Sequence, residues 1–183
     1  RRAVALSCNM ARCHNAREEL IHLSAVDFLT GEVLVNKIVK TRNKPRNWRA
    51  SVTGMTAALM AEAAAAGQAL PGWPVAREAL FQYIDSETVL VGHMLQYDLN
   101  LLGILASRVV DSDILSGEAL FGDSPLIRPF RQVWRSPGRL SSQLLRGSDQ
   151  PYEDPISSCL ERAMETREVV LQYLQTPKVF EQW

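Results

Sequence analysis

The sequence predicts one α/β domain, built on a five-stranded mixed sheet with helices on its flanks. The order of the segments carries most of this prediction: three apolar runs come before residue 40, and helical and strand patterns alternate after residue 55. Consecutive strands favour antiparallel pairing, whereas strands separated by helices favour parallel pairing. A chain of 183 residues that is 46% hydrophobic is also large enough to bury one sizeable core.

The first three strands are expected at residues 3–8, 19–28 and 32–39, which are short runs of mostly apolar side chains. Thr30 and Gly31 form a tight turn between the second and the third run, so these two strands make a hairpin. The polar stretch that follows, up to residue 54, contains a proline and a glycine and is expected to be a loop.

Helices and strands then alternate along the chain. The expected elements are a helix over 55–67 that ends at a glycine, a helix from Pro74 to about residue 84, a strand over 88–92, a helix over 93–107, an edge strand at 109–110, short helical pieces within 112–148 and a helix over about 154–174. In the 93–107 helix, four leucines recur at helical spacing, and Leu105 is the last of them.

The charge and cysteine content argue against several classes of protein. With 20 Lys and Arg against 20 Asp and Glu the net charge is zero, which by itself argues against a nucleic-acid-binding domain. Cys8, Cys13 and Cys159 are too few and too irregularly spaced for a disulfide framework, which indicates the nucleus or the cytoplasm. No apolar run approaches the ~20 residues that span a bilayer. The chain starts at Arg1 without a methionine, which suggests a single domain excised from a longer protein.

Six segments resemble, in order, the motifs of one enzyme family. Residues 4–10 read Val-Ala-Leu-Ser-Cys-Asn-Met, where the family reads Val-Ala-Leu-Asp-Cys-Glu-Met. The other similar segments are the hairpin at 26–34, the loop at 47–56, the Gly-His-x4-Asp-Leu motif at 92–99, the strand at 109–112 and the Ser-x4-Arg-Ala segment at 157–163. Over almost its whole length the chain resembles the DEDDh 3′–5′ exonucleases, in particular the eukaryotic RNA exonuclease branch, which has a ribonuclease H-like fold.

The resemblance implies which residues should carry the chemistry. The family holds two Mg²⁺ or Mn²⁺ ions with four acids, and a histidine acts as general base on the attacking water. The corresponding positions here are Ser7, Asn9, Asp98, Ser157 and Arg162, of which only Asp98 keeps the family's residue. We therefore expect a degenerate site that holds no metal ion, in a pseudo-exonuclease that is not an enzyme. A weakly active, metal-dependent 3′–5′ RNA exonuclease is the alternative.

Two further features bear on this expectation. We hypothesise that the guanidinium of Arg162 pairs with the carboxylate of Asp98 and fills the metal site with an internal salt bridge. His93 and Asp111 also lie in family motifs, and we expect them to support the fold rather than the chemistry.

Positive charge is concentrated in two segments that contain no acid. Six Lys and Arg side chains lie between residues 34 and 61, and five arginines lie between residues 124 and 148. Tryptophans within both segments add rings on which bases could stack. The predicted nucleic-acid-binding residues are Lys44, Arg46, Trp48, Arg49, Arg131 and Arg135. A solvated basic loop without a ligand is the other interpretation, so the neutral net charge says little about RNA.

The expected role is that of a scaffold in RNA metabolism or silencing. Such a scaffold would contact single-stranded RNA or dock on a protein, and a protein partner or a homodimer is expected. No contact with a membrane is expected.

Overall fold

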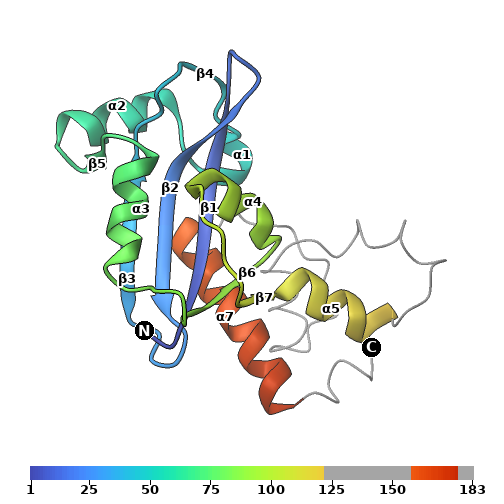
Figure 1. The fold of residues 1–183 in the computed structure, drawn as a ribbon. Helices are drawn as coiled ribbons and strands as arrows, with labels where there is room; N and C mark the ends of the chain where they lie inside the picture. Colours follow the sequence, from blue (N-terminus) through green and yellow to red (C-terminus); the bar gives the residue numbers. More distant parts are fainter. Residues whose placement is uncertain (122–157, 177–183) are drawn as a thin grey trace.

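The computed structural model describes residues 1–121 and 158–176, and these form a mixed sheet with helices on both faces (Figure 1). The strands are β1 (Ala3–Cys13), β2 (Glu18–Asp27), β3 (Val33–Val39), β4 (Pro45–Asn47), β5 (Ala69–Leu70), β6 (Val89–Gly92) and β7 (Val109–Asp111). The helices are α1 (Ala50–Thr53), α2 (Ala57–Ala65), α3 (Trp73–Phe81), α4 (Leu95–Leu102), α5 (Ser112–Phe121) and α7 (Cys159–Gln175). The predicted mixed α/β architecture is confirmed.

Strand β1 lies at the centre of the sheet. The strand order is β5-β3-β2-β1-β6-β7, and β4 pairs with the far end of β1. As predicted, β1, β2 and β3 are antiparallel and β6 and β7 are parallel, with Val4 opposite Asp27 of β2 and Leu90 of β6. Because β6 pairs with β1 only as far as Ala5, the second half of β1 has no β6 neighbour. The short strands β4 and β5 add to the five predicted ones.

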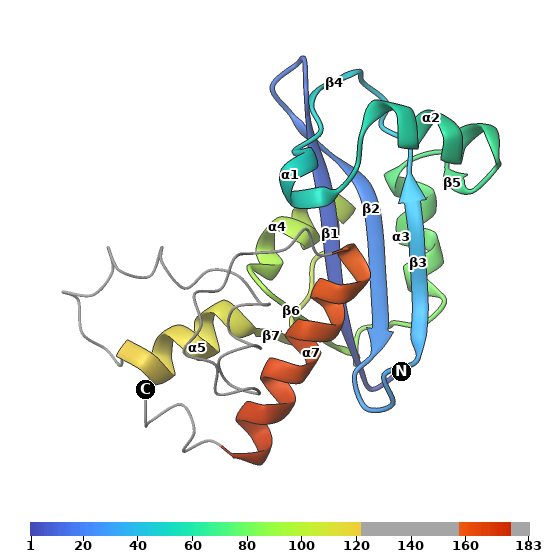
Figure 2. The same ribbon diagram turned by 180° about the vertical axis from the view of Figure 1, so that it is seen from behind.

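The two faces of the sheet carry different helices. In Figure 1, α3 and α4 lie in front of the sheet, and Figure 2 shows α7 across the back of β1 and β2. The alternation of side chains along β1 explains this arrangement. Leu6 packs in one core with Leu80 and Leu102, whereas Ala5 packs in the other with Ala163 of α7.

The polar segment 40–54 contains regular structure that the sequence analysis missed. It forms strand β4 and the four-residue helix α1. Elements this short have no hydrophobic periodicity, so a pattern search assigns them to a loop. Strand β1 is likewise longer than predicted, since pairing with β2 carries it past the polar Asn9 to Arg12, and pairing with β4 carries it to Cys13.

Helix α4 is shorter than the leucine pattern predicts. It covers Leu95–Leu102, because Met94 before it and Gly103 after it both adopt the left-handed conformation, with φ of 53° and 61°. Leu105, the last leucine of the predicted spacing, is fully exposed. The helical spacing of leucines thus extends beyond the helix itself.

Helix α7 begins with a capping box. The Ser158 hydroxyl accepts a hydrogen bond from the Glu161 N–H, and the Glu161 carboxylate accepts one from the Ser158 N–H. This cap fixes the first turn of α7, which carries Arg162. The helix start predicted near residue 154 lies outside the described residues.

Within the described residues, no helix has the length and apolar character needed to cross a membrane. The predicted nuclear or cytoplasmic location stays a prediction.

Candidate functional site

Four of the five predicted site residues gather where the second half of β1 runs between α4 and α7. Ser7 and Asn9 are two residues apart on β1, so their side chains leave the same face of the strand. Asp98 comes from the first turn of α4, and Arg162 comes from the first turn of α7. Ser7, Asn9 and Asp98 are buried, with exposed fractions of 9, 2 and 7%. The arrangement brings together two uncharged polar side chains, one carboxyl group and one guanidinium.

Asp98 is held by the edge of β1 that β6 leaves free. Its Oδ2 accepts a hydrogen bond of 3.2 Å from the Cys8 N–H, which lies beyond the last residue that pairs with β6. Burial raises the pKa of Asp98 to about 8, although the Cys8 N–H and the positive charge of Arg162 both favour the carboxylate. The negative charge of Asp111 raises this pKa further. In the absence of a bound cation, Asp98 is therefore largely protonated at neutral pH.

Asn9 carries an unused acceptor. Its Nδ2 donates to the Thr53 carbonyl at 3.4 Å, and this contact fixes which end of the amide is the nitrogen, because a carbonyl can only accept. The Oδ1 atom is buried and has no hydrogen-bond partner among the described residues. A buried acceptor without a donor costs about 1–3 kcal/mol. An orphan of this kind calls for a partner that the described residues do not supply.

Arg162 does not form the hypothesised salt bridge. The ion pairs between described residues do not include Arg162 with Asp98, and the guanidinium instead donates one hydrogen bond of 3.3 Å to the Val52 carbonyl. The positive charge still acts on the site, since it lowers the pKa of Asp98 and that of the Cys8 thiol. Asn9 on β1 and Arg162 on α7 thus donate hydrogen bonds to two successive carbonyls of α1, those of Thr53 and Val52.

Asp111 positions α4. Its Oδ1 accepts from the N–H groups of Met94 and Asp113 at 2.9 and 3.0 Å, and its Oδ2 accepts from the Leu95 N–H at 2.7 Å. It therefore caps the helix that carries Asp98. The Nδ1 atom of His93 lies 2.9 Å from the Ser112 hydroxyl. Both contacts agree with the supporting roles expected for His93 and Asp111.

The predicted RNA-binding residues divide into three groups. Lys44 and Arg46 are exposed on the loop around β4. Arg49 forms an ion pair with Glu18, and Trp48 is half-buried against the core cluster that contains Met55. Both of these side chains therefore also serve the fold. Arg131, Arg135 and the site residue Ser157 lie outside the described residues.

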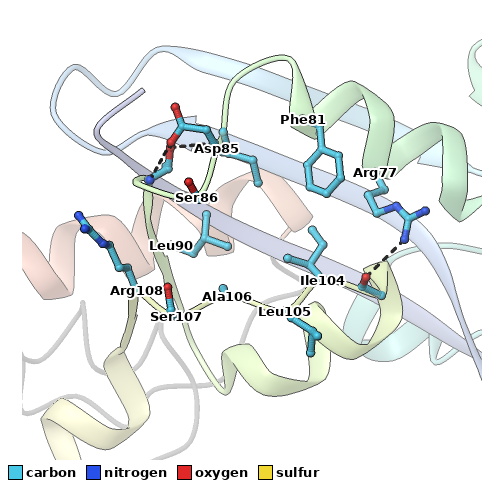
Figure 3. A pocket seen from close by; sticks show the side chains of 13 residues that line it. Arg77, Phe81, Asp85, Ser86, Leu90, Ile104, Leu105, Ala106, Ser107 and Arg108 are labelled. Carbon is cyan, nitrogen blue, oxygen red and sulfur yellow. Dashed lines mark hydrogen bonds between the residues drawn. The ribbon is translucent and has the colours of Figure 1, made fainter.

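Two hollows lie away from this site. One, of about 560 Å³, lies between α3 and the α4–β7 connection and is lined by Arg77, Phe81 and Arg108 among others (Figure 3). The other, of about 660 Å³, contains Trp73 and Tyr97 on the α3 and α4 side. Neither hollow includes a predicted site residue.

The site offers oxygen ligands for one divalent cation at most. Hard cations such as Mg²⁺ take carboxylate and amide oxygens, and the Asp98 carboxylate and the orphaned Oδ1 of Asn9 supply one of each. A second cation would meet the guanidinium of Arg162. In keeping with this, residues 1–121 and 158–176 contain no group of three or more His, Cys, Asp or Glu side chains that could hold a metal ion.

The sequence is similar to those of RNA-degrading enzymes. No protein-family model matches the chain. It is 28% identical over 112 residues to the small RNA degrading nuclease 2 of Arabidopsis thaliana, which covers 61% of this chain and 22% of that protein. It is 28% identical over 157 residues to RNA exonuclease 3 of Eremothecium gossypii, which covers 85% of this chain and 37% of that protein. The chain therefore spans well under half the length of these relatives.

The fold is similar to solved nuclease domains. The catalytic unit of Neurospora crassa Pan2, which contains a protease and a nuclease domain, matches 98% of this chain with a TM-score of 0.75 and 14% identity, over 28% of its own length. The Saccharomyces cerevisiae Pan2 pseudoubiquitin hydrolase–RNA exonuclease module in complex with AAGGAA RNA matches 98% of the chain with a TM-score of 0.70 and 17% identity, over 30% of its length. The predicted ribonuclease H-like fold is confirmed.

In sequence and in fold the chain is similar to RNA exonuclease domains. The resemblance to the DEDD-type 3′–5′ exonuclease superfamily that its motifs indicate is therefore confirmed.

The prediction that the chain is a pseudo-exonuclease and no enzyme is contradicted by these relatives, which are named as RNA-degrading nucleases. That prediction rested on counting the acids of a two-ion site at Ser7, Asn9 and Arg162. Asn9 loses the charge of the family's acid but keeps an amide oxygen, and this oxygen is buried and has no hydrogen-bond partner among the described residues.

Proposed function

We propose that this chain acts on single-stranded RNA as a weakly active, metal-dependent 3′–5′ exonuclease. The observation that carries the proposal is that the site keeps two buried oxygen groups of the kind a hard cation takes, the Asp98 carboxyl and the orphaned Oδ1 of Asn9. The relatives named as RNA exonucleases, and a structural neighbour solved with bound RNA, support RNA as the substrate.

The weakness of the activity follows from the charge of the site. Asp98 and Asn9 would hold one divalent cation, which would polarise a phosphoryl oxygen and activate water when bound. The cation has to displace a proton from Asp98, because burial raises the pKa of this carboxyl to about 8. With one carboxylate in place of several, we expect the affinity for the cation to be low.

The exposed Lys44 and Arg46 support contact with RNA. They extend from the loop around β4, which lies at the end of the sheet where β1 finishes. Cations on a mobile side chain neutralise phosphates without reading the sequence, so RNA binding should weaken with salt. The predicted scaffold role, protein partner and homodimer rest on no contact in the described residues and stay predictions.

The test is a cleavage assay with the whole chain and a single-stranded RNA labelled at its 5′ end, in Mn²⁺ or Mg²⁺. We expect a slow ladder of products shortened from the 3′ end, with none in EDTA. Asp98→Asn should abolish the ladder, because it removes the carboxylate. Asp113→Asn is the matched control, since it makes the same carboxyl-to-amide change at a half-buried position outside the site. Intact RNA after prolonged incubation at high Mn²⁺ would refute the proposal.

A further inference from the structure

The guanidinium of Arg162 has hydrogen-bonding capacity that the fold does not use. A guanidinium has five N–H donors, and the described residues give this one a single hydrogen bond, to the Val52 carbonyl. At 3.3 Å that bond lies at the long end of the usual range for N–H···O. No acid within the described residues forms an ion pair with Arg162. The group is half-buried, and within residues 1–121 and 158–176 it is a cation without an ion-pair partner.

The unused hydrogen-bonding groups at the site are of two opposite kinds, the donors of Arg162 and the acceptor of Asn9. The guanidinium can only donate, so it requires an acceptor, and its planar fork suits the oxygens of a phosphate. The Oδ1 atom of Asn9 can only accept, so it requires a donor such as a hydroxyl. The two side chains hold neighbouring carbonyls, those of Val52 and Thr53, which places both beside the same turn of α1. One ligand that carries both an anionic oxygen group and a hydroxyl would satisfy both side chains.

We infer that Arg162 binds a backbone phosphate near the 3′ end of RNA while the Oδ1 of Asn9 accepts from a ribose hydroxyl, so that this site holds RNA without any metal ion. The choice of RNA as the ligand rests on the proposed function. A phosphate alone would leave Asn9 without a donor, and an uncharged sugar would leave Arg162 without an anion. DNA offers the phosphate and a terminal 3′-hydroxyl but lacks the 2′-hydroxyl, so a contact of Asn9 with the 2′-hydroxyl would favour RNA over DNA.

Arg162 lies in a different environment from the exposed basic residues of the loop around β4. Lys44 and Arg46 are surrounded by solvent, where each charge contributes weakly and equally to RNA and DNA. Arg162 lies beside buried groups, where a charge-assisted hydrogen bond is stronger. A single substitution at Arg162 should therefore cost more than one at the exposed loop.

The test is the binding of a short fluorescent oligouridylate to the whole chain in EDTA, where no cleavage occurs, followed by anisotropy. We expect Arg162→Gln to weaken binding about tenfold, and Arg162→Lys to restore part of the affinity because the charge remains but the fork is lost. Arg108→Gln is the matched control. It removes the same charge from an exposed arginine on the far side of α4, paired with Glu87, and should change affinity less than about twofold.

Two further measurements sharpen the test. Circular oligouridylate, which has no 3′ end, should bind the native chain as weakly as linear RNA binds the Arg162→Gln variant. Asn9→Ala should reduce the preference for RNA over the matching oligodeoxyuridylate. The melting temperature of each variant, measured alongside, shows that the change lies in binding and not in folding.

The outcomes distinguish this inference from the proposed function. If Arg162→Gln binds linear RNA as tightly as the Arg108→Gln control, Arg162 is not a phosphate-binding residue, whatever the cleavage assay shows. If binding in EDTA depends on Arg162 and no RNA is ever shortened, the inference holds and the proposed nuclease activity fails.

Discussion

Asp98 is a buried acid whose ionisation the fold opposes. Burial raises its pKa to about 8, whereas the carboxyl of an unfolded chain titrates near ~3.9. Between these two values the folded state binds one proton more than the unfolded state. The free energy of unfolding should therefore fall as the pH rises from about 4 to about 8, by several kcal/mol, because each unit of pKa corresponds to ~1.4 kcal/mol. Urea titrations in EDTA at pH 5 and pH 8.5 measure this change.

Other groups titrate near this window, and Asp98→Asn separates them. Burial lowers the pKa of His22, so its contribution has the opposite sign: stability rises as the pH rises through the ordinary histidine range. The lowered pKa values of Asp27 and Asp85 act only in acid, below about 4. The Asn variant should thus lose the decline with pH and exceed the native chain in stability at pH 8.5. The same decline in both proteins would contradict the role given to Asp98.

Asp111 is the carboxylate on which the position of α4 depends. It accepts three backbone hydrogen bonds, two of them from Met94 and Leu95 at the start of the helix. Asp111→Ala should lower the free energy of unfolding by about 2–4 kcal/mol, because it leaves these N–H groups without an acceptor. Asp113→Ala provides the control, with an expected change within about 0.5 kcal/mol. Equal losses in both variants, measured by urea unfolding, would argue against the cap.

At this scale the resemblance to the exonucleases assigned residues, whereas their contacts could not be predicted. The family motifs were sufficient to assign Ser7, Asn9, Asp98 and Arg162 to one region. The salt bridge expected for Arg162 is absent because its partner is a backbone carbonyl, that of Val52. Backbone acceptors carry no identity in a sequence, so no pattern of residue types reveals them.

At the scale of elements, the junction between β6 and α4 decides where Asp98 lies. Gly92 ends β6, and a Cβ atom there would lie 2.5 Å from Leu95 Cδ1 and 3.1 Å from Leu95 Cβ. Leu95 is itself buried, so it has little room to move. The absence of a side chain at Gly92 therefore permits the close approach of the helix to the strand.

Gly92→Ala should push α4 away from β6. We expect a loss of about 1–3 kcal/mol in the free energy of unfolding, as for other overpacked core positions, together with reduced Mn²⁺-dependent cleavage. Gly67→Ala is the comparison, because a Cβ there meets nothing within 4 Å although φ is +68°. It should cost only the smaller backbone strain, about 1 kcal/mol, and leave cleavage unchanged. A Gly92 variant as stable and as active as the native chain would refute this view of the junction.

Predictions of elements followed the strength of their hydrophobic patterns. The long strands and α7 have clear patterns and were expected, whereas β4 and α1 have none. The end of α4 shows a different limit. The leucine spacing continues to Leu105, but the left-handed conformation of Gly103 ends the helix first, and Leu105 lies in solvent.

At the scale of the whole molecule, the net charge of the chain does not describe how charge is distributed near its site. The net charge is zero, yet the loop around β4 exposes Lys44 and Arg46 while the acids Glu18 and Glu19 are engaged near the same end of the sheet. Fold class could be read from segment order, and the resemblance to the exonucleases from the motifs, because both are properties of the whole chain. The proposed activity could not, because it depends on which oxygen atoms remain unpaired at one point inside the fold.

Two hydrogen bonds to α1 connect the site inside the fold to the surface of the molecule. Asn9 reaches Thr53 from the sheet, and Arg162 reaches Val52 from α7. A ligand that binds the other donors of the Arg162 guanidinium would share this side chain with the Val52 carbonyl, so occupancy of the site and the position of α1 are thermodynamically linked. By reciprocity, a contact that moves α1 from outside would change the affinity of the site for its ligand.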